Sequence, residues 1–129
     1  MTTPIHHISL TVSDVDRSAA WYQALFGEAD VAERNLDGGR RVRMAFASGL
    51  TLGVSQYDPN EQLAPFSHRT AGLDHLGIGC ESEAQVREWA AKLDALGFIH
   101  GPVEDAPYGW AVTARDPDNI PVEFFCPKV

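Results

Sequence analysis

The sequence consists of two similar halves, and this internal repeat constrains the fold more than any other feature. His7 opens the run His-Ile-Ser-Leu-Thr-Val-Ser-Asp, and Gly27 follows 20 residues later. His75 opens a second run of similar pattern, and Gly97 follows 22 residues later. A repeat with a period of about half the chain has to be settled before any fold is assigned. The two halves are therefore expected to fold alike, with His7 and His75 at equivalent positions.

Size and charge limit what the chain can be. It has 129 residues, 44% of them apolar, which suits the core of one domain. Ten basic residues against eighteen acidic ones give a net charge of -8, which disfavours nucleic acid and anionic membranes as partners. No apolar run reaches the roughly 20 residues that span a bilayer, and the N-terminus lacks the features of a signal peptide. We therefore expect a cytoplasmic protein with no nucleic-acid or membrane partner.

Hydrophobic periodicity predicts the same order of elements in both halves. In the first half, the predicted elements are strands at residues 5–12, 29–36, 41–47 and 50–57 and a helix at 15–26. In the second half, they are strands at 73–80, 109–115 and 120–126, a short strand after Gly97, and a helix from Ser82 to Leu96. Each half therefore has the order β-α-β-β-β.

Residues typical of turns separate these elements. Gly27 lies where a left-handed residue would end the first helix, and the runs Asp-Gly-Gly at 37–39 and Asp-Pro-Asp-Asn at 116–119 predict turns. Residues 58–72 are a connector too short to separate independent domains. The fold class is therefore predicted to be α+β. We expect one domain over residues 1–129, with tandem modules at about 4–57 and 73–127 that form a curved mixed sheet around a metal or ligand cavity.

Three candidate metal ligands lie on strand faces opposite the mainly apolar ones, although Glu123 shares its face with Phe125. His7, His75 and Glu123 each alternate with apolar neighbours along their predicted strands. If the helices cover the apolar faces, these three side chains converge on the uncovered face. Two imidazoles and a carboxylate are typical of non-haem Fe(II) centres and also hold Zn(II). We predict that they form a metal site, whereas His6 should point to the other face.

The repeat also indicates where a fourth ligand would stand. Glu123 follows its histidine by 48 residues, and the first helical region is two residues shorter, so the equivalent position is 7 + 46 = 53. Gly53 occupies that position and has no side chain with which to bind a metal. Three protein ligands leave positions open for water or substrate, which is typical of a catalytic site.

Other residues are predicted to border this site. Ser9 shares the predicted face of His7, and Tyr108 and Trp110 precede or begin a strand that neighbours Glu123. Tyr108 is the candidate for donating a hydrogen bond or a proton, although both rings could simply pack at an edge. Arg41 and Arg43 alternate along a strand, where they could meet a carboxylate of the substrate or mark a solvated face. Two cysteines, Cys80 and Cys126, are expected to be buried thiols.

The repeat, the run Leu73-Asp74-His75 and the turn ahead of Val122-Glu123-Phe124 resemble the vicinal oxygen chelate superfamily. That superfamily includes glyoxalases, extradiol dioxygenases, fosfomycin-modifying enzymes and bleomycin-resistance proteins. The resemblance implies a homodimer that binds adjacent oxygens of a small-molecule substrate on a divalent transition metal, Fe(II), Mn(II), Ni(II) or Zn(II). It also implies that His7, His75 and Glu123 are the ligands.

Departures from the superfamily pattern leave the reaction open. Glyoxalases resemble one another in carrying a ligand where this chain has Gly53, and extradiol dioxygenases carry a Tyr near the position of Thr113. The excess of acidic residues argues against the strongly cationic pocket that a phosphonate would need. Two functions from different classes remain. One is a metal-dependent lyase or dioxygenase, and the other is a metal-free protein of the bleomycin-resistance kind that sequesters a compound.

Overall fold

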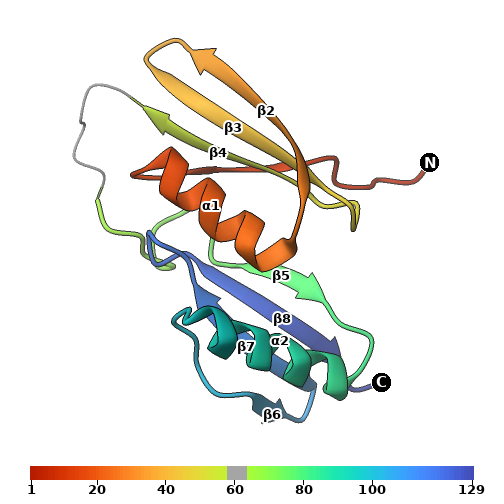
Figure 1. The fold of residues 1–129 in the computed structure, drawn as a ribbon. Helices are drawn as coiled ribbons and strands as arrows, with labels where there is room; N and C mark the ends of the chain where they lie inside the picture. Colours follow the sequence, from red (N-terminus) through yellow and green to blue (C-terminus); the bar gives the residue numbers. More distant parts are fainter. Residues whose placement is uncertain (58–63) are drawn as a thin grey trace. The chain divides into compact units, whose positions relative to one another are not determined.

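The structure is a computed structural model that describes residues 1–57 and 64–129, so part of the predicted connector lies outside the described residues. The chain divides into two compact units, Met1–Ala64 and Pro65–Val129. Their positions relative to one another are not determined, and each unit is therefore described by itself (Figure 1). In the described residues, no helix is long and apolar enough to span a membrane.

The first unit is a four-stranded mixed sheet with one helix against it (Figure 1). Its elements are β1 (Ile8–Thr11), α1 (Val15–Phe26), β2 (Ala29–Leu36), β3 (Gly39–Phe46) and β4 (Thr51–Tyr57). The strand order is β1-β4-β3-β2, in which β1 runs parallel to β4 and the other pairs are antiparallel. Helix α1 packs against β3 and β4.

The second unit repeats this arrangement. Its elements are β5 (Leu76–Gly79), α2 (Glu83–Leu96), β6 (Glu104–Ala106), β7 (Gly109–Arg115) and β8 (Pro121–Pro127). The strand order is β5-β8-β7-β6, again with one parallel pair, β5 with β8. Helix α2 packs against β7 and β8. The predicted α+β class and the repeated β-α-β-β-β order are therefore confirmed.

The strands that follow the two histidines begin later than their alternation predicts. β1 begins at Ile8 and β5 at Leu76, because these residues pair with Leu52 and Val122, near the beginning of β4 and β8. Upstream of Leu52 the partner strand leads back into a turn, and upstream of Val122 it contains Pro121, which has no N–H to offer. His7 and His75 therefore each lie one residue ahead of a strand.

One face of each sheet holds the core. In the first unit, Leu10, Val42, Met44 and Val54 are buried, together with Tyr22 of α1. In the second, the buried set consists of Val86 and Leu93 of α2 and Val112, Val122 and Phe124 of the sheet. Cys80 and Cys126 are both free and buried, as predicted. The other face of each sheet is therefore available for polar side chains.

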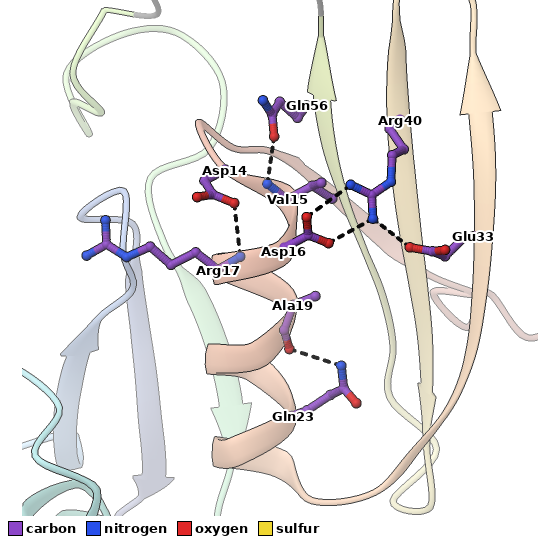
Figure 2. Close-up of polar contacts among 9 residues, drawn as sticks. All are labelled: Asp14, Val15, Asp16, Arg17, Ala19, Gln23, Glu33, Arg40 and Gln56. Carbon is purple, nitrogen blue, oxygen red and sulfur yellow. Dashed lines mark hydrogen bonds and ion pairs between the residues drawn. The ribbon is translucent and has the colours of Figure 1, made fainter.

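Polar contacts fix α1 on its sheet (Figure 2). The side chain of Asp14 caps the helix by accepting a hydrogen bond from the backbone N–H of Arg17 at 3.1 Å. The N–H of Val15 donates to Oε1 of Gln56 at 2.9 Å. Arg40 donates to Asp16 of the helix at 2.7 Å and also binds Glu33 of β2. These contacts place one arginine of β3 on the helix side, where carboxylates neutralise it.

The turns agree with the predictions in most respects. Oδ1 of Asp116 accepts hydrogen bonds from the N–H groups of Asp118 and Ile120, and Asn119 adopts a φ of 67°. Gly38 of the first hairpin adopts a φ of 75°. Gly27 differs, since its φ of 90° is combined with a ψ of -161°, outside the left-handed helical region that the sequence predicts.

Candidate functional site

The strand registers test the equivalence that the repeat suggests. In the first unit Ser9 pairs with Gly53, and in the second Gly77 pairs with Glu123. Ser9 lies two residues after His7, and Gly77 lies two residues after the second histidine of the repeat. Gly53 is therefore the counterpart of Glu123, as the sequence spacing predicts. The first unit has no carboxylate at this position.

The second unit brings two of the predicted ligands together. Nε2 of His75 lies 3.7 Å from Oε1 of Glu123. The side chains are 44% and 29% exposed, so both remain accessible to a ligand. Glu123 lies on β8, on the sheet face opposite buried Val122 and Phe124. A nitrogen and an oxygen donor therefore face one another on the uncovered face of this unit.

Asp74 orients the imidazole of His75. Its Oδ1 lies 2.6 Å from Nδ1 of His75. An ionised carboxylate can only accept a hydrogen bond, so Nδ1 carries the proton and the lone pair of a neutral ring lies on Nε2, toward Glu123. Metal-binding histidines commonly have this arrangement, in which a carboxylate fixes the tautomer. Asp74 was not predicted from the sequence to have a role, although a carboxylate directly before a candidate ligand was a usable signal.

The pair of donors fits a metal ion. Nitrogen and oxygen ligands at about 2.0–2.2 Å from one tetrahedral ion lie about 3.3–3.6 Å apart. The observed separation of 3.7 Å between the two donor atoms is close to this range. Among residues 1–57 and 64–129, neither atom has another hydrogen-bond or ion-pair partner, because Asp74 binds the opposite nitrogen of the ring. Imidazole and carboxylate together suit Zn(II), Fe(II) and Mn(II).

His7 belongs to the first unit, and the structure does not place it relative to His75 and Glu123. Within residues 1–57 and 64–129, no group of three or more His, Cys, Asp or Glu side chains is close enough to hold a metal. Nδ1 of His7 lies 2.8 Å from Nδ1 of His6. Nε2 of His7 is free to bind a metal when its Nδ1 donates this hydrogen bond.

The prediction that His6 points away from His7 is wrong. The two rings contact one another edge to face, with centroids 5.1 Å apart, and both line the same hollow in the first unit. The prediction assumed that strand alternation extends through residues 5–7. Since β1 begins at Ile8, the two histidines precede the strand and the alternation does not apply to them.

The uncovered sheet face of the first unit forms a hollow of about 350 Å³. Both histidines contribute to its wall, as does Ser9, which is predicted from its strand face to line the pocket. The other residues come from the three remaining strands: Ala32, Arg34, Arg41, Arg43 and Gly53. The hollow thus extends across all four strands of this sheet.

Three arginines in this hollow contradict the charge argument made from the sequence. Arg41 and Arg43 lie on β3, and Arg34 lies directly opposite Arg41 on β2. Nε of Arg41 donates to Oγ of Ser55 at 2.7 Å. The net charge of -8 describes the whole chain, whereas strand pairing decides which charges gather at one place. A cationic pocket therefore exists in an acidic protein.

Gly53 keeps the floor of the hollow open. A Cβ atom at this position would lie 2.8 Å from Oγ of Ser9 and 3.7 Å from Cδ of Arg41. A larger side chain would therefore displace Ser9 or fill the space beside the arginine. The glycine that removes the fourth ligand also provides room for a bound molecule.

The two aromatic residues predicted to border the site, Tyr108 and Trp110, lie in different environments. Tyr108 is 71% exposed, and its ring lies 6.3 Å from that of Phe125, which shares a strand face with Glu123. Trp110 instead pairs with Cys126, on the helix-covered face opposite Glu123. Its Nε1 is buried without a hydrogen-bond partner in the described part of the chain, and Nζ of Lys128 lies 4.8 Å from the ring centre.

Comparisons with known proteins agree with this architecture. The chain is 28% identical to the uncharacterized protein YqjT of Bacillus subtilis over 136 residues, which covers 96% of this chain and 99% of YqjT. The crystal structure of a glyoxylase/bleomycin resistance protein/dioxygenase domain from Frankia sp. EAN1pec is similar, with a TM-score of 0.88 and 26% identity. The alignment covers 99% of this chain and 94% of that domain.

A more distant structure shares the fold. It is a mutant of FosX, a genomically encoded fosfomycin resistance protein of Listeria monocytogenes, complexed with Mn(II) and 1S,2S-dihydroxypropylphosphonic acid. The TM-score is 0.72 at 22% identity, and the alignment covers 100% of this chain and 95% of FosX. Residues 4–124 match the sequence pattern of one family. The chain therefore belongs to the Glyoxalase/Bleomycin resistance protein/Dioxygenase superfamily.

Proposed function

We propose that this protein is a divalent-metal-dependent enzyme that acts on a small molecule with adjacent oxygen atoms. The proposed metal ligands are His75 and Glu123 of the second unit and His7 of the first. The metal is a transition ion such as Fe(II), Mn(II), Ni(II) or Zn(II), all of which accept imidazole and carboxylate ligands. When bound, it would polarise the adjacent oxygens of the substrate as a Lewis acid.

The observation that carries this proposal is the pairing of His75 with Glu123. Two donor atoms 3.7 Å apart, with the imidazole held by Asp74 at 2.6 Å, match the arrangement that metal sites use. Family membership supports the same reading, since the FosX structure holds Mn(II).

The remaining residues are assigned roles in binding and proton transfer. Gly53 occupies the position in the first unit that is equivalent to Glu123 and provides no metal ligand. Coordination positions on the metal would therefore remain for the substrate. Tyr108 has an exposed phenol and is proposed to supply a proton or a hydrogen bond to the substrate. Its test is Tyr108→Phe, which keeps the ring and removes only the hydroxyl group.

The alternative, a metal-free protein that sequesters a compound, is weakened by the charge of the hollow. The net charge of -8 would suit a cationic compound in this alternative. Three arginines line the hollow in the first unit, and they would repel such a compound. A purely sequestering pocket would also have no need for a carboxylate-oriented imidazole facing Glu123.

Turnover by the loaded protein tests the proposal. The full chain, freed of metal with a chelator and reloaded with each of the four metals, should be assayed by NMR on diols, catechols and hemithioacetals. We expect one metal to restore turnover of one substrate class, and Glu123→Gln and His75→Ala to abolish it. Stoichiometric binding of a compound that is recovered unchanged, with or without metal, would support the sequestering function instead. We also propose that the protein is a homodimer, which light scattering on the same samples tests.

A further inference from the structure

The hollow of the first unit gathers three arginines on one sheet face. Arg34 and Arg41 are direct cross-strand partners, and Arg43 lies two residues further along the same face of β3. Like charges at directly opposite positions of a sheet destabilise it. Arg34 and Arg43 are exposed, so solvent reduces this cost, and a bound anion would reduce it further.

The protein supplies no such anion within the described residues. Among residues 1–57 and 64–129, neither Arg34 nor Arg43 has a carboxylate within ion-pair distance, and the only side-chain partner of Arg41 is the hydroxyl of Ser55. Arg40, on the opposite face of the same strand, binds both Asp16 and Glu33. Within the described part of the chain, the arginines of the hollow therefore lack the carboxylate partners that Arg40 has.

The geometry of Arg41 favours an oxyanion. Its Nε is occupied by Oγ of Ser55 at 2.7 Å, which fixes the plane of the guanidinium and leaves the terminal nitrogens as donors. A planar pair of donors suits a carboxylate or a phosphonate, which accept two parallel hydrogen bonds. The hydroxyl of Ser9, on the floor beside Gly53, adds a neutral donor.

We infer that the hollow formed by Arg34, Arg41 and Arg43 binds an acidic group of the substrate, either a carboxylate or a phosph(on)ate. This inference rests on the proposed function in naming the bound molecule as the substrate and in giving that molecule adjacent oxygens. His7, a proposed metal ligand, lines the same hollow. The molecule would therefore carry its acidic group on the arginines and its adjacent oxygens toward His7. The substrate class is then a small organic acid with vicinal oxygens.

Calorimetric titration of the full chain tests this inference, with acetate and methylphosphonate as probes and acetamide as an uncharged match for acetate. The protein is used both as purified and after removal of metal. We expect saturable binding of at least one anion, weakened about tenfold in Arg34→Gln and in Arg43→Gln, because each loses a charge-assisted hydrogen bond. Arg17→Gln, which removes the same charge from α1, is the control and should bind the anions as tightly as the parent protein does. Added salt should weaken the binding.

The outcomes are separable from those of the metal test. Tighter binding of one anion than of the other identifies the acid class. The inference is overturned if acetamide binds as tightly as acetate, if Arg34→Gln and Arg43→Gln bind as the parent does, or if neither anion binds saturably. Arginine-dependent anion binding by a protein that takes up no metal would sustain the hollow as an anion site and refute the proposed enzyme. Circular dichroism of each variant confirms that it is folded.

Discussion

At the scale of single residues, a few positions determine which ligands the uncovered face of each sheet can bind. Gly53 leaves open space beside Ser9, and its counterpart Glu123 provides a carboxylate. Asp74 orients the ring of His75 through a hydrogen bond of 2.6 Å between its Oδ1 and Nδ1 of the ring. Small changes at these positions should have specific effects on binding, whereas changes at packed glycines should affect stability.

Gly109 is a packed glycine, at which a substitution should affect stability. A Cβ atom there would lie 2.5 Å from Cε2 of Phe125 and 2.6 Å from the carbonyl oxygen of Cys126. Gly109→Ala should therefore lower the free energy of unfolding by about 1–3 kcal/mol, as overpacking usually does. Gly79→Ala is the matched control, because nothing lies within 4 Å of its Cβ position. Urea unfolding measures both, and equal stabilities would refute the packing described for β7 and β8.

Asp74→Asn tests the orientation of His75. The amide keeps the size of the side chain and removes the charge that holds the proton on Nδ1. We expect metal affinity to fall by about 10–100-fold with little change in stability, since outer partners of metal ligands have effects of this size. Titration with Zn(II) against a competing chelator measures it. An unchanged affinity would show that Asp74 contributes only a surface contact.

At the scale of elements, the segment after α2 shows how local contacts modify a predicted strand. The sequence predicts one short strand after Gly97, whereas the structure has an isolated bridge at His100 and then β6 at Glu104–Ala106. Pro102 lies between them and has no N–H to donate, which interrupts the pairing. The segment is also fixed to α2 through His100.

His100 makes stability depend on pH. Its Nε2 lies 2.5 Å from Oδ1 of Asp94 on α2, and its Nδ1 lies 2.6 Å from the carbonyl of Gly101. Two acceptors favour the charged ring, so the bond to Asp94, more than that to Gly101, raises the pKa of His100 above its usual 6.5. The stabilisation is complete below about pH 6.5 and is lost as the pH rises through the raised pKa.

Thermal unfolding between pH 5.5 and 8.5 measures this dependence. The midpoint of the parent should fall relative to that of His100→Gln as the pH rises, because only the parent loses a charged contact. His68→Gln, a change at an exposed histidine, should follow the parent. Parallel curves for the parent and His100→Gln would contradict the contact with Asp94.

At the scale of the whole molecule, the repeat made most of the fold predictable. Periodicity gave the order of elements, and counting from His75 to Glu123 located Gly53, which the strand registers confirm. The beginnings of β1 and β5 could not be predicted, because they depend on where partner strands turn. The arginine hollow was missed for a related reason, since Arg34 and Arg41 become neighbours only through the register of β2 and β3.

The most direct test of the account is the metal content of the purified full chain. The protein should be prepared without chelators or an affinity tag and measured by elemental analysis beside His7→Ala, Glu123→Ala and Glu88→Gln. Glu88 is an exposed carboxylate on α2, so its variant controls for the loss of one negative charge. We predict close to one transition metal per chain in the parent and in Glu88→Gln, and a loss of tight binding in the other two. No metal in the parent even after reconstitution, or equal metal in all four proteins, would contradict the account.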